Sequence, residues 1–480
     1  MRKFIIGLLI VLMAAGCSTE KKQWSDDFNM VLSQFNNDHE GLKKPTADFQ
    51  QYQTFDRGEY VSYDEYLSYF YNGEIPKTAI TTEAAREDIE FYFQMLRQFY
   101  GGYLHFGGDE RFEQAKAECL SYLNETGLIE TNKLVLIMLT ATNFIKDNHF
   151  TIGNKRSNAA SKYFSNEELS FYKKDNKIYD AKGRQVTAVD QDHEAENYFY
   201  LSLDDEGQIC WHFGLLLKQY PQPSYVLTYD TGEQESISVD YVYLKNTTAY
   251  TESVLEGVPI VQIGEMFTEY GENRKLADQF LNSAELLSKS DAAILDLRNN
   301  NGGNGLLPLK WIERYTGQRV GLNSSGIMIY DGDLEINDHL LADDSQKMSE
   351  IIDYFNATPI GKGIYQKNNC HNETVANDRV LFVLMNGYSA SAAEYMIDAL
   401  HNVENVIFVG TSSAGCLQSD NGNVLVLPNS NIKVAFGNSW SEYDPEYYQE
   451  FEGFQPDLWI NSNHLEEIIL KFIKNNQQTD

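Results

Sequence analysis

The stretch from residue 379 to residue 415 constrains the fold of this chain more than any other. Its first part, Val380–Met385, is an uninterrupted apolar run, typical of a strand buried on both faces of a parallel sheet. Asn386-Gly387 ends that strand, and small or apolar residues then recur at helical spacing from Ala390 to Leu400. The stretch therefore predicts a strand, a tight turn, a helix and a second strand, the alternation of an α/β fold with a parallel sheet.

Two serines lie in the turn of this stretch. Ser389 and Ser391 fall at or just before the predicted helix N-terminus, where unpaired backbone N–H groups and the positive end of the helix dipole can stabilise an oxyanion. A hydroxyl at that place meets the first requirement of a serine nucleophile. The turn alone leaves a second interpretation open, in which one serine only caps the helix.

A second motif, AAILDLRNNNGG at 292–303, has the pattern of a buried strand followed at once by arginine, asparagines and two glycines. Adjacent glycines at the end of a strand let the backbone approach a ligand and present N–H groups to it. Ligands of α/β sheets bind at the carboxyl ends of the strands, so the motif predicts part of a site. Taken alone, it also fits a turn that only redirects the chain.

The pattern upstream of these motifs changes twice. Apolar residues recur at helical spacing after Thr82, the expected N-cap, and in two later segments, which predicts a helical domain. Short alternating stretches such as Tyr225–Tyr229, separated by turn pairs, predict a β-rich module of the size of a peptide-binding domain. The expected boundaries are 1–17 for a signal peptide, 18–45 for a tether, 46–150 for the helical N-terminal domain, 151–254 for the β-rich module, and 255–480 for the α/β catalytic domain with its insertion 304–378.

Residues 1–17 have the pattern of a secretory signal. Basic residues precede an apolar run at 4–13, too short to span a membrane, and small residues lead to Cys17. Ala-Ala-Gly-Cys resembles a bacterial lipobox, with Cys17 as the lipid attachment residue, although Ala14 stands where leucine is commoner. We therefore expect a lipid-anchored protein of the bacterial cell envelope that faces the periplasm or the exterior. The alternative is a plain signal peptide with an incidental cysteine.

Charge and cysteine content exclude several kinds of site. The formal net charge is −32 and no cluster of Lys and Arg occurs, which argues against nucleic-acid binding. No CxxC or Cys/His metal spacing is present, so neither a metal nor another cofactor is expected. Three disulfide pairings are possible, but we expect the remaining cysteines to be mostly free and buried: Cys119, Cys210, Cys370 and Cys416.

Taken together, the motifs resemble a known family. LDLRNNNGG, NGYSASAAE, VGTSSAG and EFEGFQPD, in that order, resemble the catalytic domain of the C-terminal-processing and tricorn-type serine peptidases. The resemblance extends upstream, because the segment Asp147-Asn148-His149-Phe150 is similar to the D-x-H segment of the tricorn-like branch. It covers most of residues 80–460, and it implies a crotonase/Clp-like α/β fold and a peptide or protein substrate.

The resemblance also implies the roles of residues around the turn. The nucleophile falls on Ser391, three residues before Glu394, with Ser389 as the second candidate. The implied oxyanion hole consists of the N–H of Ala392 and a glycine N–H of the pair Gly302-Gly303. This agrees with the helix dipole at the same turn.

The general base departs from the best-known branch of the family. Members of that branch use a Ser-Lys dyad, but here Cys416 follows the GTSSAG segment and no lysine occurs until Lys433. The tricorn-like branch uses a histidine as the base, and a relay of hydrogen-bonded side chains joins that histidine to a glutamate. The histidine maps onto His149 and the glutamate onto Glu450. A histidine can take the serine proton at neutral pH. Asn148 stands where a tricorn serine links the two groups.

The predicted function is thus an exported serine peptidase that cleaves peptide bonds through an acyl-enzyme. One alternative is an inactive family member that binds a peptide or an apolar ligand, because the lysine is missing and Ala393 replaces a common second serine. Another is an esterase of the α/β-hydrolase type, whose nucleophile elbow requires G-x-S-x-G, whereas the segment 387–391 ends in serine.

Overall fold

The structure, a computed structural model, describes most of the chain from residue 24 to residue 477. The gaps within that span are 42–44, 46–47, 59–67, 244–247, 270, 330–357, 362–363, 369–372 and 421. The predicted signal peptide, Cys17, Cys370 and much of the expected insertion therefore lie outside the described residues. Of the helices in the described part, none combines the length and apolar character that a membrane crossing requires.

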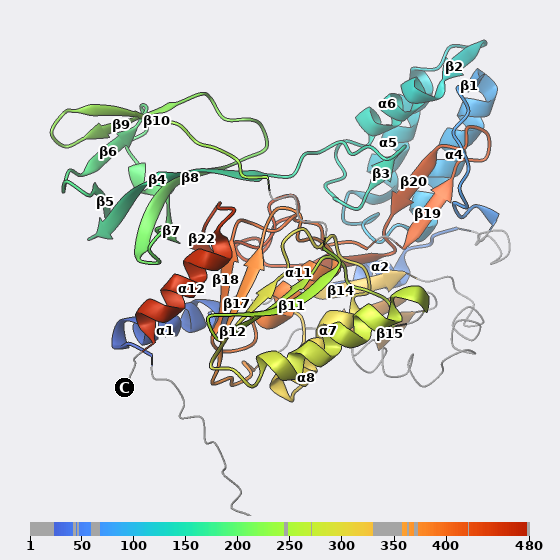
Figure 1. Cartoon of the computed structure of the whole chain (residues 1–480). Coiled ribbons are helices and arrows are strands. Elements are labelled where there is room, and N and C mark those ends of the chain that lie inside the picture. The colour runs from blue at the N-terminus through green and yellow to red at the C-terminus, as the bar shows by residue number, and fades with distance from the viewer. Residues whose placement is uncertain are drawn as a thin grey trace, which may run out of the picture.

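A six-stranded sheet forms the centre of the α/β region (Figure 1). Neighbouring strands are parallel, except at one edge, where the first two strands of the order pair antiparallel. The predicted α/β fold with a parallel sheet is therefore confirmed. In spatial order the strands are β11 (Tyr250–Leu255), β12 (Val258–Ile263), β13 (Ala292–Asp296), β17 (Val380–Met385), β18 (Val406–Gly410) and β22 (Leu458–Trp459).

Helices cover both faces of this sheet. Successive side chains of a strand point to opposite faces, so Ala293 and Leu295 of β13 enter one core while Ala292 and Ile294 enter the other. The first core is completed by α7 (Arg274–Leu287), α8 (Leu306–Thr316) and α11 (Ala392–Leu400), and the second by α1 (Asp26–Glu40) and α12 (Leu465–Asn476). Burial on both faces explains the continuous apolar runs in the sequence.

The helical part near the N-terminus shares its core with strands near the C-terminus. Figure 1 shows α4 beside β19 and β20, and Leu425, Val434 and Phe436 join the apolar cluster of the helices. The unit expected at 46–150 is therefore completed by residues 423–436. Its elements are α2 (Gln50–Thr54), β1 (Ala79–Thr81), α4 (Thr82–Phe99), α5 (Gly108–Ser121), β2 (Leu128–Glu130), α6 (Thr131–Ala141), β3 (Thr151–Ile152), β19 (Asn423–Val426) and β20 (Lys433–Phe436).

The first long helix of this unit begins one residue earlier than expected. The N-cap is Thr81, whose hydroxyl accepts the N–H of Ala84 at 3.2 Å, and Thr82 is already helical. Two consecutive threonines make both positions compatible with capping in the sequence. Thr81 rather than Thr82 caps the helix, since Thr81 is also the last residue of β1, which pairs with β2.

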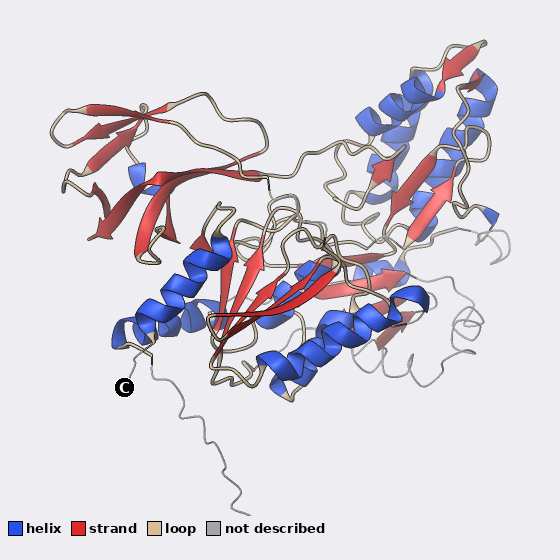
Figure 2. Ribbon diagram, in the orientation of Figure 1, coloured by secondary structure: helices blue, strands red, loops and turns tan. Residues whose placement is uncertain are grey.

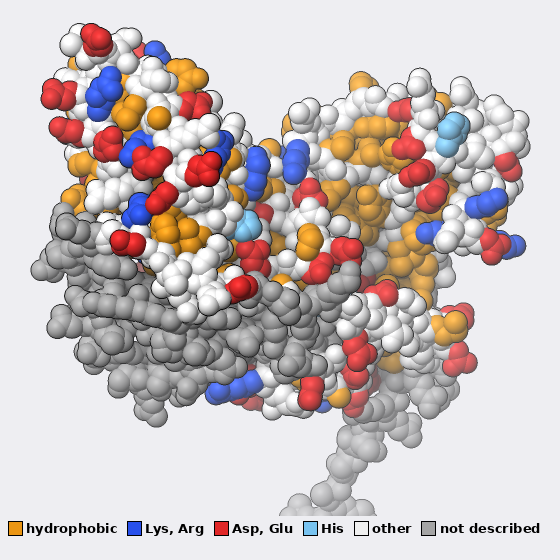
Figure 3. Space-filling model, turned by 180° about the vertical axis from the view of Figure 1, so that it is seen from behind, with side chains coloured by type: hydrophobic (Ala, Val, Ile, Leu, Met, Phe, Trp, Pro, Cys, Tyr) orange, Lys and Arg blue, Asp and Glu red, His pale blue; other side chains and the backbone are white. Residues whose placement is uncertain are grey.

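The β-rich module consists of two small antiparallel sheets with a core of their own (Figure 2). Seen from behind, the surface is hollowed between this module and the helical part, with hydrophobic side chains on the module's side of the hollow (Figure 3). One sheet has the order β5-β4-β8-β7 and the other β10-β9-β6. The elements are β4 (Lys162–Lys174), β5 (Lys177–Asp180), β6 (Val186–Val189), η1 (Ala195–Tyr198), β7 (Phe199–Leu203), β8 (Ile209–Leu217), β9 (Tyr225–Tyr229) and β10 (Gln234–Ile237).

The described part of the expected insertion is joined to the catalytic region. Helix α8 packs in the core of the sheet, and β14 (Ser325–Ile329) pairs with β21 (Ser439–Glu442) from the C-terminal segment. The remaining elements are the short helix η2 (Gly271–Asn273) and the strands β15 (Thr358–Gly361) and β16 (Ile364–Asn368), which extend the sheet from β14.

Candidate active site

Ser391 occupies a sharp turn between β17 and α11. Its backbone has φ 54° and ψ −117°, a conformation that residues with a side chain rarely adopt. Such strain is concentrated at functional sites, because the surrounding structure must hold the residue in place. Ser391 is partly exposed and is the N-cap residue of α11, at the positive end of that helix.

The second candidate, Ser389, has a different environment. Its side chain is fully buried, and its hydroxyl donates to the carbonyl of Leu297 at 2.8 Å. The same oxygen accepts the N–H of Asn386 at 3.0 Å. Ser389 therefore joins the turn to the end of β13, and its hydroxyl is already committed to the backbone.

Of the two glycines after β13, Gly302 lies against Ser391 and Gly303 lies against the backbone of Met266. A Cβ on Gly302 would lie 2.7 Å from the Cβ of Ser391 and 2.9 Å from the nitrogen of Ala392. The N–H of Gly302 donates to Asn300 Oδ1 at 2.9 Å. Within the described part of the chain, no acceptor is bound to the N–H of Gly303 or of Ala392. Of the three predicted oxyanion-hole residues, Gly303 and Ala392 thus have a free donor, whereas the donor of Gly302 is occupied.

Glu394 connects Ser391 to the loop of residues 415–418. Its buried carboxylate accepts the N–H of Ser391 at 3.2 Å and the N–H of Cys416 at 2.8 Å. It also accepts the N–H of Gly415 at 2.9 Å and the hydroxyl of Ser413 at 2.6 Å. Burial raises the pKa of Glu394 to about 7, against the effect of these donors. In the sequence, Glu394 served only to locate Ser391, three residues before it. A serine followed three residues later by glutamate is nevertheless the spacing of a capping box.

His149 lies at the end of the helical part, close to the same loop. Its Nδ1 is 3.4 Å from Cys416 Sγ, and its backbone N–H donates to Asp147 Oδ1 at 2.9 Å. Burial lowers the pKa of His149 to about 4, an effect that the negative charge of Asp420 opposes. The imidazole is therefore neutral at pH 7. Glu394, which binds the N–H of Ser391, and His149 both contact Cys416, but among the described side chains no hydrogen bond joins Ser391 to His149.

Glu450 lies behind His149 without touching its ring. The carboxylate accepts the backbone N–H of Asn148 at 2.8 Å and the N–H groups of Leu417 and Gln418, both at 3.2 Å. It also accepts the hydroxyl of Tyr448 at 2.9 Å. Burial and the charge of Asp147 raise the pKa of Glu450 to about 8. Glu450 therefore binds the backbone next to His149 rather than its imidazole.

Asn148 does not link Glu450 to His149 through its side chain. Its amide Nδ2 donates to the carbonyls of Ala414 and Gly415, at 3.2 and 3.0 Å. These two hydrogen bonds tie the segment of Asn148 and His149 to the backbone before Cys416.

Lys433 is accounted for elsewhere. It belongs to β20, and its Nζ lies 5.1 Å from the ring centroid of Tyr71.

Cys119, Cys210 and Cys416 are free and buried. Among the residues that the structure describes, no cluster of His, Cys, Asp and Glu could hold a metal ion.

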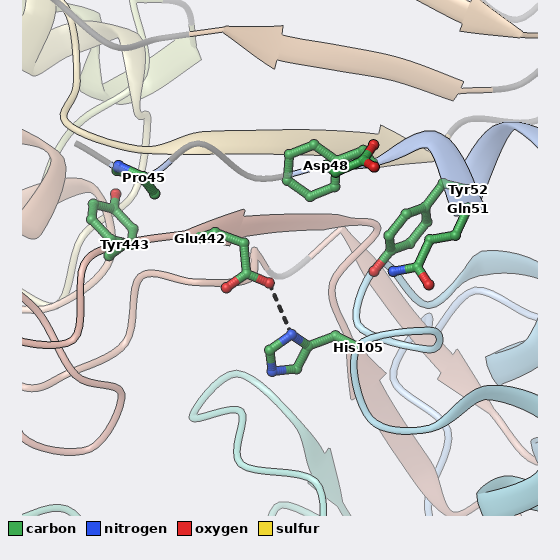
Figure 4. A pocket seen from close by; sticks show the side chains of 8 residues that line it. Pro45, Asp48, Gln51, Tyr52, His105, Glu442 and Tyr443 are labelled. Carbon is green, nitrogen blue, oxygen red and sulfur yellow. Dashed lines mark ion pairs between the residues drawn. The ribbon is translucent and has the colours of Figure 1, made fainter.

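A separate pocket of about 340 Å³ lies beside β21 (Figure 4). In it the ring of His105 points at the carboxylate of Glu442, with Nδ1 and Oε1 2.8 Å apart. One wall approaches the site, because Tyr443 packs on Tyr448 with ring centroids 4.9 Å apart and Tyr448 binds Glu450. The lining residues are Pro45, Asp48, Phe49, Gln51, Tyr52, His105, Glu442 and Tyr443.

Comparison with known proteins gives one match in sequence and several in structure. Residues 258–460 match peptidase family S41. Mature CPAF complexed with lactacystin is 14% identical, with 82% of this chain and 98% of that chain covered and a TM-score of 0.44. The photosystem II D1 C-terminal processing protease is 12% identical, with coverages of 80% and 96% and a TM-score of 0.34. A lipoprotein from Streptococcus agalactiae is 13% identical, with coverages of 84% and 99% and a TM-score of 0.37. No curated protein matches the sequence.

The assignment rests on the sequence match. The matched residues run from β12 to β22 and include the turn of Ser391, the pair Gly302-Gly303 and Glu450. His149 lies outside them, in the helical part. The match of residues 258–460 to peptidase family S41 supports a serine-type peptidase.

Proposed function

We propose that the protein is an exported peptidase in which Ser391 is the nucleophile and His149 the general base. The observation that carries this proposal is the strained backbone of Ser391 at the N-terminus of α11, next to the unoccupied N–H of Ala392. Strain is maintained only where the surroundings over-determine it, and free N–H donors beside a hydroxyl are what acyl transfer requires.

The reaction proceeds by acyl transfer. Ser391 Oγ attacks the peptide carbonyl while His149 Nε2 takes the hydroxyl proton, and the N–H groups of Ala392 and Gly303 bind the resulting oxyanion. The C–N bond then breaks as His149 returns the proton to the leaving amine. Water, deprotonated by the same imidazole, hydrolyses the acyl-enzyme and frees the serine.

The β-rich module is proposed to guide the peptide to this turn. Tyr243, which follows the module's last strand, lies edge-on to Tyr388 with ring centroids 5.8 Å apart. Tyr388 belongs to the turn that carries Ser391, so the end of the module adjoins the site. We further propose that Cys17 carries a lipid that retains the protein at the bacterial envelope.

A fluorophosphonate probe tests the nucleophile and the base without knowledge of the natural substrate. The probe phosphonylates an activated serine, with release of fluoride, so we expect the wild type to be labelled and Ser391→Ala not to be. His149→Ala should label at least about 100-fold more slowly. Ser389→Ala, a neighbouring serine with a committed hydroxyl, is the matched control and should label. Labelling of Ser391→Ala at the wild-type rate would overturn the proposal.

One observation favours a second candidate, an inactive family member that binds a peptide. Glu450 does not touch the imidazole, so His149 lacks the carboxylate that would stabilise its protonated form. If the folded wild type is not labelled but still binds peptides in a calorimetric titration, this second function is correct.

A further inference from the structure

We infer that Cys416 is a positioning residue for the base, and that its sulfur accepts the Nδ1–H of His149. The inference rests on the proposed function and deepens it. Sγ and Nδ1 are 3.4 Å apart, within hydrogen-bond range for sulfur. Among the side chains that the structure describes, no other one forms a hydrogen bond with this imidazole.

The tautomer explains why this contact matters. A neutral imidazole carries one proton, and only the tautomer with the proton on Nδ1 leaves Nε2 free to accept the proton of Ser391. A group that accepts from Nδ1 selects that tautomer and fixes the plane of the ring. Burial raises the pKa of the Cys416 thiol well above its usual range, so the acceptor is a neutral sulfur and not a thiolate.

The backbone around Cys416 is held unusually firmly. The N–H groups of Gly415 and Cys416 donate to Glu394, and those of Leu417 and Gln418 donate to Glu450. Glu394 also binds the N–H of Ser391, and Glu450 also binds the N–H of Asn148. The two carboxylates therefore connect the thiol with both catalytic segments, and this is the arrangement expected for a group that must keep its distance to His149.

The charges around the pair influence its protonation as well. Asp420 and Arg156 act on the imidazole in opposite directions, and Asp147 binds the backbone N–H of His149. Glu450, Glu394, Asp147 and Arg156 act on the thiol. Variants of Cys416 leave all of these in place, so a change in pH dependence can be attributed to the sulfur.

The test compares Cys416→Ala and Cys416→Ser by the rate of fluorophosphonate labelling of the full chain between pH 4 and 9. We expect Cys416→Ala to label about 10- to 100-fold more slowly than wild type at pH 7. The pH below which the labelling rate falls should also differ from that of the wild type. Cys416→Ser retains an acceptor and should recover part of the rate. Nitrogen NMR of ring-labelled histidine should show a proton on Nδ1 of His149 in wild type and a mixture of tautomers in Cys416→Ala.

Cys119→Ala is the matched control, since Cys119 is a free cysteine buried in the core of the helical part. It should label at the wild-type rate. If Cys416→Ala labels like wild type with the same pH profile while His149→Ala is slow, the inference is wrong and the proposed function stands. If Ser391→Ala or His149→Ala labels like wild type, the proposed function itself is wrong. Serine rescue distinguishes a positioning role from a loss of folding.

Discussion

Gly302 and Ser391 touch across the site: a Cβ added to the glycine would lie 2.7 Å from the Cβ of the serine. Real Cβ atoms do not come so close, and the carbonyl of Ala390, at 2.8 Å, leaves no room on the other side. Gly302 also has φ +95°, which disfavours any side chain. The glycine after the end of β13 thus limits where Ser391 can lie.

Gly302→Ala should therefore inactivate the site. We expect fluorophosphonate labelling to fall at least about 100-fold, because the new methyl group displaces Ser391 from the free N–H groups. Gly257→Ala is the control, since Gly257 has a similar φ of +84° but no atom within 4 Å of the added Cβ. Equal labelling of the two variants would show that crowding at Ser391 is irrelevant.

Glu394→Gln should weaken both the fold and the site. A glutamine amide can replace only one of the two carboxylate oxygens, so its NH2 group faces N–H donors and leaves them unpaired. Urea denaturation should show a loss of about 1 to 3 kcal/mol, together with slower labelling of Ser391. Glu285→Gln, at an exposed position of α7, should change neither quantity. A fully stable and fully reactive Glu394→Gln would refute the role of this carboxylate.

Glu450 makes the stability depend on pH. Its pKa is raised from 4.5 to about 8, so between these values the folded protein binds more protons than the unfolded chain, and the free energy of unfolding falls as the pH rises. His149 has a lowered pKa and acts in the opposite sense only below about pH 6.5. Urea denaturation between pH 6.5 and 8 should show a shallower slope for Glu450→Gln than for wild type, and identical slopes would contradict the assignment.

The pH dependence of labelling should report the protonation of His149, the proposed base. With a pKa of about 4, His149 remains neutral at pH 5, where an exposed histidine would be mostly protonated. We expect the labelling rate of the wild type to persist at pH 5 and to decline toward pH 4. Circular dichroism at each pH confirms that the protein stays folded. A midpoint near 6.5 would mean that the imidazole is solvated.

Cys17→Ser should release the protein from the membrane. One acyl group gives only marginal binding, and stable anchoring needs more than one lipid chain, as on a lipidated N-terminal cysteine. Fractionation of cells that express the full chain should show the variant in the soluble fraction and the wild type with membranes. Retention of the variant would point to another means of attachment.

The fold was predictable where burial leaves a strong pattern. The strand Val380–Met385 has the bounds that its apolar run predicts, because both faces of the sheet are covered. The extent of the helical unit was not predictable. Its core takes in the strands at 423–426 and 433–436, and no local pattern indicates a partner so distant in the chain.

The candidate site was predictable only in part. The turn of Ser391 and the two glycines follow from strand ends and a helix N-terminus, which are local features. The contact of His149 with Cys416, the backbone contacts of Glu450 and the four donors around Glu394 depend on loops that meet in space. In the sequence, Cys416 was notable only because it follows the segment where related peptidases carry the lysine. Its contact with His149 could be identified only from the structure.

The hairpin of β19 and β20 has a consequence for biosynthesis. The ribosome makes the helices α4 to α6 early, yet their core lacks two strands until nearly the whole chain has emerged, and β22 closes the central sheet later still. His149 therefore has no finished support, and Glu450 has not yet been made, while the rest of the chain is growing. We therefore expect a nascent chain that ends before residue 450 not to react with a fluorophosphonate probe, because the proposed site then lacks Glu450.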